Sequence, residues 1–110
     1  MMLKPSDITR DIILTNLSKG VCKVYFRKVT NGRFRSLYCT LKYNALPRDN
    51  RKYIEQIFSS FKNDLDLIPV YDIVDSEWKS FRLSTILQFY TNEDLMKSET
   101  EKRKVKVLEQ

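Results

Sequence analysis

Several residue types are absent or scarce in this 110-residue chain, and each absence excludes a kind of chemistry. There is no histidine, which removes the commonest general base and the commonest metal ligand. Ser-His and Cys-His catalytic arrangements are therefore impossible. With only two glycines the chain cannot build a glycine-rich phosphate loop. Three acidic residues, Asp72, Asp75 and Glu77, lie near a predicted loop, where carboxylates more often cap a turn than hold a metal. We therefore expect a protein that is not an enzyme and that uses no metal or other cofactor.

Cysteines and long apolar runs are also scarce. Cys22 and Cys39 are the only cysteines, and without histidine they form no zinc site. We expect them to be buried, reduced thiols in diagonal positions of one hairpin, about 7–8 Å apart and too distant for a disulfide. No apolar run approaches the roughly 20 residues of a membrane span, and the first residues lack the apolar region of a signal peptide. These features predict a cytoplasmic protein with no membrane association.

Positive charge is present in excess and is concentrated in one segment. The formal net charge is +6. Ten basic residues and a single acidic residue, Asp49, lie between Lys19 and Lys52, so this segment carries +9 and the rest of the chain −3. A local excess of this size favours a phosphate-bearing partner. A solubilising surface and a docking face for an acidic protein are the alternatives.

Residues 20–42 carry the clearest structural pattern. Two alternating segments flank Asn31-Gly32, a dipeptide that favours a two-residue type I′ turn because both of its central residues take positive φ. Such a turn would pair Tyr25 with Tyr38 and place Lys28 opposite Arg35. One face of the hairpin would then be apolar, with Cys22, Val24, Phe26, Leu37, Cys39 and Leu41, and the other would carry Lys23, Tyr25, Arg27, Ser36, Tyr38, Thr40 and Lys42.

Two helices are expected around this hairpin. The first runs from Asp7 to Ser18, is capped by Ser6 and ends at Gly20. The second is capped by Asp49 or Asn50 and runs to about residue 63. Its apolar residues recur with the spacing of one helical face, which indicates packing against the core: Ile54, Ile57, Phe58, Phe61 and Leu65.

The remaining pattern predicts a second hairpin and a short last strand. Strands are expected at 70–74 and 78–83, with Pro69 at the start or at an edge, followed by one helical turn at 84–86 and a strand at 87–90. Residues 1–90 would form one domain, and residues 91–110 a charged tail that is flexible or helical. The predicted interior consists of Val24, Phe26, Leu37, Leu41, Ile73, Phe81, Leu83 and Ile86.

Three short motifs resemble a family of small tailed-phage proteins. Residues 20–28 (GVCKVYFRK), 39–41 (CTL) and 78–82 (WKSFR) are similar to the family patterns GVCxVxFxK, CTL and WRSFR, and the similarity covers about residues 8–90. Position 79 is lysine here, where the pattern usually has arginine. The resemblance implies an SH3-like β-barrel, a phage origin, expression in a bacterial cytoplasm and a role that is not enzymatic. The expected fold is therefore α+β, a barrel of about five antiparallel strands with an N-terminal helix and a helix inserted between the hairpins.

Binding to nucleic acid is the leading functional hypothesis, because the polar hairpin face combines cations with tyrosines. The predicted DNA- or RNA-binding residues are Lys23, Tyr25, Arg27, Lys28, Arg33, Arg35, Tyr38 and Lys42. The alternative is an interaction module that binds and modulates a bacterial host protein, such as a component of transcription, a nuclease or a defence factor. Its predicted contact residues are Arg48, Arg51, Lys52 and Trp78. Nothing in the sequence indicates a small-molecule substrate.

Overall fold

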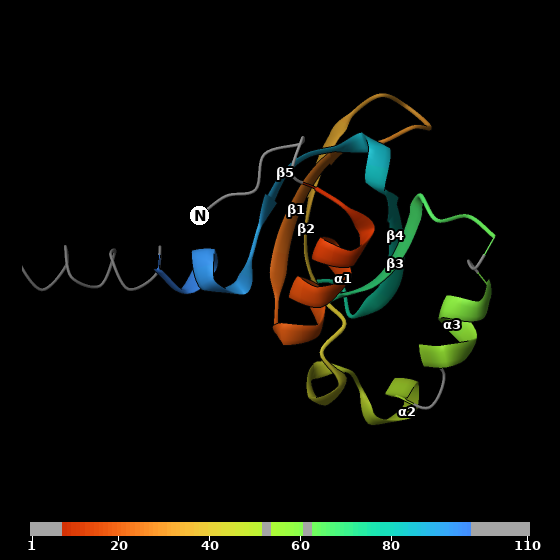
Figure 1. Cartoon of the computed structure of the whole chain (residues 1–110), viewed down its shortest axis with the longest axis vertical. Helices are drawn as coiled ribbons and strands as arrows, with labels where there is room; N and C mark the ends of the chain where they lie inside the picture. Colours follow the sequence, from red (N-terminus) through yellow and green to blue (C-terminus); the bar gives the residue numbers. More distant parts are fainter. Residues whose placement is uncertain (1–7, 52–53, 61–62, 98–110) are drawn as a thin grey trace, which may run out of the picture.

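The computed structural model describes residues 8–51, 54–60 and 63–97, which form an α+β fold around one five-stranded antiparallel sheet (Figure 1). The strands are β1 (Cys22–Arg27), β2 (Phe34–Thr40), β3 (Leu67–Asp72), β4 (Glu77–Arg82) and β5 (Ile86–Tyr90). The helices are α1 (Arg10–Lys19), α2 (Arg48–Arg51) and α3 (Ile54–Ser60), with 3₁₀ turns η2 (Tyr43–Ala45) and η3 (Leu83–Thr85). Residues 92–97 are also helical. None of the described helices is both long and apolar enough to span a membrane.

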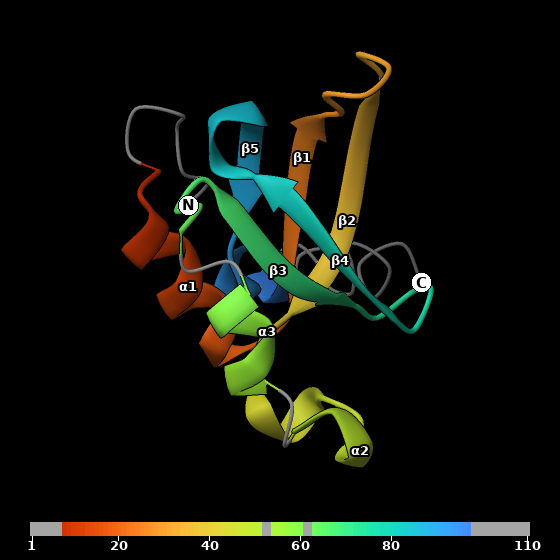
Figure 2. The ribbon, with the colours of Figure 1, turned by 90° about the vertical axis from the view of Figure 1, so that its right-hand side faces the viewer.

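The strand order is β4-β3-β2-β1-β5, and the sheet opens between β2 and β3. These two strands pair only at Cys39–Asp72 and Thr40–Tyr71, whereas β3 and β4 pair along their whole length. In Figure 2, β3 and β4 cross β1 and β2 at a steep angle. Within the described ranges β4 and β5 are joined by η3 but do not pair, so the sheet is not closed into a barrel.

The first hairpin differs from the predicted one at its turn. Gly32 has a φ of 68°, but Asn31 is not among the described residues with positive φ, so the type I′ turn is wrong. Instead, Gly32 N donates to Lys28 O and Lys28 N donates to Arg33 O, which leaves a four-residue loop at 29–32. The strand register moves by two residues: Lys23 pairs with Tyr38, Tyr25 with Ser36 and Phe26 with Arg35.

This two-residue shift leaves the two faces of the hairpin unchanged, because side chains alternate with a period of two. The predicted pairs Tyr25–Tyr38 and Lys28–Arg35 are wrong, yet the division into an apolar and a polar face is confirmed. The shift also places Cys22 directly opposite Cys39, where diagonal positions were predicted. Both cysteines are buried free thiols, as expected.

The core lies between α1 and the apolar face of the sheet. Ile13 and Leu17, one helical turn apart, are fully buried against it, together with Phe89 of β5. Most of the predicted interior residues are buried, namely Val24, Phe26, Leu37, Leu41, Phe81 and Ile86. Ile73 is a correction: it follows the end of β3 and is 41% exposed. Leu83, at the start of η3, is only partly buried.

Several predicted boundaries also change. The N-cap of α1 is Thr9, whose Oγ1 accepts from Ile12 N at 3.3 Å, while the predicted Ser6 cap lies outside the described residues. Within the described residues the predicted second helix is represented by α2 and α3, and its predicted residue Phe61 lies outside them. Leu65, predicted on the same helical face, is 65% exposed. Pro69 lies in the middle of β3, and it is tolerated there because β2 does not pair with β3 at this point.

Candidate nucleic-acid interface

The outer face of the sheet is the surface that faces away from α1 and the core. We use this name for the side chains that β1, β2 and β5 present there: Lys23, Tyr25, Arg27, Phe34, Ser36, Tyr38, Gln88 and Tyr90. The helix α1 packs on the opposite side of the sheet, where Ile13 and Leu17 belong to the core (Figure 1). Five of these residues line a shallow hollow of about 240 Å³ that spans the three strands.

Lys23 lies at the centre of this face, between two tyrosines. Its Nζ is 5.5 Å from the centroid of the Tyr38 ring and 5.6 Å from that of Tyr90. Such cation–π contacts hold the ammonium group in place without neutralising its charge. Tyr38 is 40% exposed, so its ring remains open to solvent. A positive charge thus lies between aromatic rings on an open surface.

A second aromatic pair lies nearer the tip of the hairpin. The rings of Tyr25 and Phe34 stack with a centroid distance of 5.8 Å and an interplanar angle of 19°. Phe34 is 59% exposed, although it is a large apolar side chain on a strand. Together with Tyr25 and Tyr38 it makes an aromatic patch on the outer face, and a contiguous patch is more informative than a single exposed apolar residue.

The cations at the hairpin tip have no acidic neighbour in sequence, because residues 19–42 contain seven basic and no acidic residues. Arg27 Nε donates to Gly32 O at 3.1 Å, which holds the guanidinium over the loop. Lys28, Arg33 and Arg35 form no ion pair within the described part of the chain. Their charges are therefore available to an anionic ligand.

Two residues near the end of β2 depart from the predicted face. Thr40 is fully buried: its Oγ1 lies 3.0 Å from Gly20 O and 3.3 Å from Leu17 O, and it accepts from Lys42 N. The hydroxyl thereby satisfies carbonyls at the end of α1 instead of facing solvent. Lys42 itself is exposed but lies beyond β2, at the start of η2.

The described residues predicted to contact a host protein belong to two separate elements, α2 and β4. Arg51 donates to Leu46 O and Asn44 O, and it lies 5.2 Å from the Tyr43 ring, so it braces the η2 segment. Arg48 is exposed on α2, and Lys52 lies outside the described residues. Trp78 lies on β4, where it packs edge-on against Tyr71 with a centroid distance of 5.7 Å.

The second hairpin holds its charges internally. Lys79 Nζ lies 2.6 Å from Asp72 Oδ2 and also contacts Asp75 and Glu77. Burial alone would raise the pKa of Asp72, but hydrogen bonds from Lys79 and from the Asp75 and Val74 amides lower it below its usual value. Hydrogen bonds to the carboxylates of Asp72 and Asp75 raise the pKa of Lys79. The predicted role of this acidic cluster in capping a turn is confirmed by the two backbone hydrogen bonds to Asp72 Oδ1.

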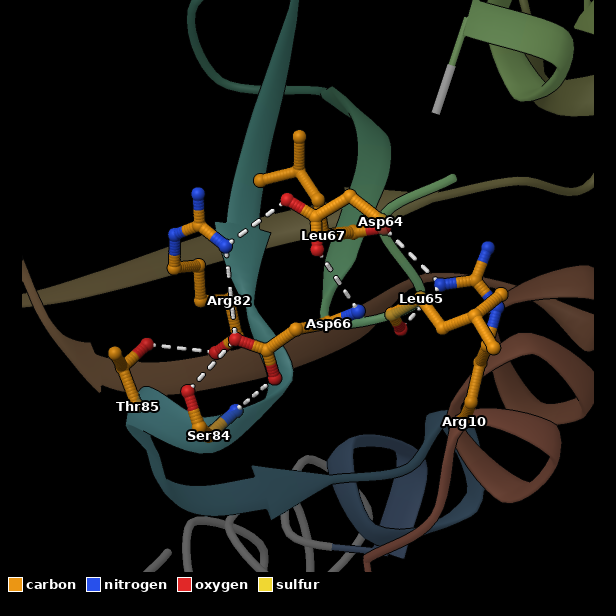
Figure 3. A network of polar contacts seen from close by, with 8 residues as sticks. All are labelled: Arg10, Asp64, Leu65, Asp66, Leu67, Arg82, Ser84 and Thr85. Carbon is orange, nitrogen blue, oxygen red and sulfur yellow. Dashed lines mark hydrogen bonds and ion pairs between the residues drawn. The ribbon is translucent and has the colours of Figure 1, made fainter. Parts of the chain in front are cut away.

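A second polar network joins β4 to the segment that precedes β3. Arg82 Nη1 lies 3.1 Å from Asp64 Oδ2 and 3.7 Å from Asp66 Oδ2, and Asp66 also accepts from Ser84 (Figure 3). Arg10 of α1 donates to Leu65 O and Leu67 O on the other side of the same segment. These arginines serve to hold the fold together.

The described residues contain no group of three or more His, Cys, Asp or Glu side chains arranged to hold a metal ion. Burial raises the pKa of the Cys22 thiol to about 11 and also raises that of Cys39. Both thiols therefore stay protonated near neutral pH, and a protonated thiol is a poor nucleophile.

Phe34, Gln88 and Tyr90 belong to the outer face but were not predicted as site residues. Gln88 and Tyr90 are brought there by the pairing of β5 with β1, where Tyr90 lies opposite Lys23 and Gln88 opposite Tyr25. This contact joins residues more than 60 positions apart in the sequence. The alternation of Gln88 and Tyr90 with the buried Phe89 was the available signal, because it marks which of the three face away from the core.

Comparisons with known proteins place the chain among phage proteins. It is 30% identical over 78 residues to an "Uncharacterized 11.5 kDa protein in Gp31-cd intergenic region" of Enterobacteria phage T4, which spans 71% of this chain and 74% of the phage protein. No family model matches the chain, and no solved structure matches it. The phage relationship expected from the sequence motifs is therefore confirmed, and the chain belongs to the family of this phage T4 protein.

Proposed function

We propose that this protein is a non-enzymatic, single-stranded nucleic-acid-binding protein and that its outer face is the binding surface. The observation that carries the proposal is the arrangement of Lys23 between the rings of Tyr38 and Tyr90, next to the stacked pair Tyr25–Phe34. Open aromatic rings offer stacking surfaces to unpaired bases, and the cations beside them offer contacts to phosphates.

The geometry of this surface favours single strands over a duplex. Bases in a duplex are stacked on one another and cannot reach an aromatic ring, whereas the bases of a single strand can turn toward it. Lys23 and Arg27, the two cations of the outer face, would contact the phosphates, and Tyr38 and Phe34 would stack with bases. Because none of these contacts reads a base edge, we expect little sequence preference.

We also infer that the sheet is an opened relative of the SH3-like barrel and that the protein acts in the cytoplasm of an infected bacterium. The order β4-β3-β2-β1-β5, with a 3₁₀ turn between β4 and β5, supports the first inference. The phage T4 relative supports the second. Neither inference affects the choice of the outer face, which depends only on the positions of its side chains.

Fluorescence anisotropy with labelled single-stranded DNA, single-stranded RNA and duplex DNA tests the proposal. Tyr38→Ala should weaken single-strand binding by about 1–3 kcal/mol, the usual value of one base–aromatic contact. Tyr43→Ala is the matched control, because Tyr43 is also exposed but lies on η2, away from the outer face. The affinity of the wild type should fall steeply with salt, as it does whenever lysine and arginine bind phosphates.

The outcomes distinguish the proposal from non-specific attraction to a basic protein. If Tyr38→Ala and Tyr43→Ala bind equally well, the aromatic rings play no part and the outer face is not the site. If no oligonucleotide binds more tightly than about 1 mM at 50 mM salt, where binding free energies are only near −4 kcal/mol, the proposal is wrong.

A further inference from the structure

A groove runs between the tip of the first hairpin and β4, on the inner side of the opened sheet. It has a volume of about 410 Å³. Its floor contains Phe26, Leu37 and Phe81, which are almost fully buried, and its walls include Arg27, Lys28 and Arg35 on one side and Lys79 and Arg82 on the other. The groove exists because β2 and β3 pair at only two positions and then diverge.

The two walls differ in their available charge. On the β4 wall, Lys79 is held by Asp72 and Asp75, and Arg82 by Asp64 and Asp66. On the hairpin wall, Lys28 and Arg35 have no acidic partner in the described ranges. An occupant of the groove would therefore meet uncompensated positive charge along one wall only.

The same wall ends in an open strand edge. Lys28 N donates to Arg33 O, so residues 28 and 33 form a hydrogen-bonded pair. Pairs alternate along an antiparallel ladder, which makes Tyr25–Ser36 a non-hydrogen-bonded pair and directs the N–H and C=O of Ser36 away from β1. Tyr38, two residues further on, confirms this direction because its carbonyl accepts from Ile73 N. Ser36 and Phe34 pair with no strand on this side in the described part of the chain.

We propose that this groove binds an extended, acidic segment of a partner protein, which pairs with the open edge of β2 as an additional strand. The edge supplies backbone donors and acceptors in alternation, Lys28 and Arg35 attract carboxylates, and the apolar floor accepts alternate aliphatic side chains. A peptide fits better than a nucleic acid. It can use both the N–H and the C=O of the strand edge, and the aromatic rings of the floor are too deeply buried to stack with bases.

The test uses a fluorescein-labelled decapeptide of alternating glutamate and valine, titrated with the full chain and followed by anisotropy. The wild type should bind it, and Arg35→Glu should weaken binding by at least roughly tenfold, because a charge reversal replaces attraction by repulsion. Lys19→Glu, a reversal at an exposed position at the end of α1, should bind as the wild type does. Amide hydrogen exchange at Ser36 should slow when the peptide is present.

Two further arms separate strand addition from simple attraction of anions. A decapeptide with the same sequence but with an N-methyl group on every residue has no backbone N–H left on either edge to pair with β2 and should lose binding. Tyr38→Ala should bind the parent peptide normally, since its side chain lies on the outer face. The inference is wrong if the methylated peptide binds as well as the parent peptide, or if Tyr38→Ala loses peptide binding. It is also wrong if a single-stranded oligonucleotide displaces the peptide competitively, or if the peptide binds no more tightly than about 1 mM.

Discussion

The β1–β2 hairpin and the β3–β4 hairpin are built from strands of similar length, six or seven residues each, but they treat charge differently. In the β3–β4 hairpin, Lys79 and Arg82 each contact two or more carboxylates. In the β1–β2 hairpin, Lys23 contacts two aromatic rings and Arg27 a backbone carbonyl instead. One hairpin pairs its charges within the fold, and the other has cations without an ion pair in the described part of the chain.

We therefore expect the charges of the β3–β4 hairpin to affect stability and, if the proposed function holds, those of the β1–β2 hairpin to affect binding. Removing one partner of a buried ion pair strongly destabilises the fold, because the other charge then stays buried without compensation. An exposed cation without an ion pair contributes little to the free energy of unfolding, and it breaks no ion pair of the fold when it binds an anion. Changes in the two hairpins should therefore affect different measurements.

The largest effect on stability is expected at Asp72, whose side chain is only 3% exposed. Asp72→Ala removes the partner of Lys79 and the acceptor of the Val74 and Asp75 amides. We expect the free energy of unfolding to fall by about 3 kcal/mol, measured by urea denaturation. A loss below ~1 kcal/mol would show that the pair does not hold the hairpin together.

A matched pair of serine substitutions tests the separation of roles in binding. Ser36 and Ser80 are both exposed on strands, one on the outer face and one on β4. Ser36→Asp places a carboxylate beside Lys23 and Tyr38 and should weaken single-stranded DNA binding about tenfold, or ~1.4 kcal/mol. Ser80→Asp should leave DNA binding unchanged. Equal losses in both variants would mean that only the net charge matters.

The pH dependence of stability should also originate in the second hairpin. The folded-state pKa of Asp72 is lowered from 3.8, so its contribution is present above that unfolded value and is lost as the pH falls through the folded pKa. Urea midpoints measured from pH 6 down to pH 2 should therefore drop in the acid range. Asp72→Asn should flatten this drop. A wild-type-like slope in the variant would assign the acid sensitivity to other carboxylates.

The smallest effects compare one arginine from each hairpin. Arg82→Ala removes two partly exposed ion pairs, with Asp64 and Asp66, and should cost about 1 kcal/mol of unfolding free energy. Arg35→Ala removes an exposed side chain without an ion pair in the described residues and should change stability by less than about 0.5 kcal/mol. Thermal denaturation resolves the difference. The comparison fails if Arg35→Ala proves the more damaging of the two.

The faces of the first hairpin could be predicted from the sequence even though its turn could not. Side chains alternate between the two faces along residues 22–27 and 34–40. An error of two residues in the predicted pairing of these strands therefore leaves the same side chains on the same face. The turn itself depends on the φ of Asn31. A four-residue loop with a single positive φ, at Gly32, competes with the type I′ turn there.

The parts that could not be predicted depend on contacts between distant residues. The network of Arg82 with Asp64 and Asp66, and the position of Tyr90 beside Lys23, both follow from which strands pair and how far they extend. The burial of Thr40 also depends on a contact between distant residues. Its place in the alternation puts it on the polar face, but the end of α1 packs over it and uses its hydroxyl.

Residues after β5 secure the start of β1. Asn92 Nδ2 donates to Val21 O, and the Asn92 side chain lies so close to Gly20 that a Cβ there would be only 2.7 Å from it. The helix at 92–97 begins with a reciprocal cap between Thr91 and Asp94. During synthesis, β1 leaves the ribosome long before β5 and Asn92 have been made. β1, which lies between β2 and β5, therefore keeps one edge unpaired until roughly sixty more residues have been added, so we expect the native sheet to assemble late in translation.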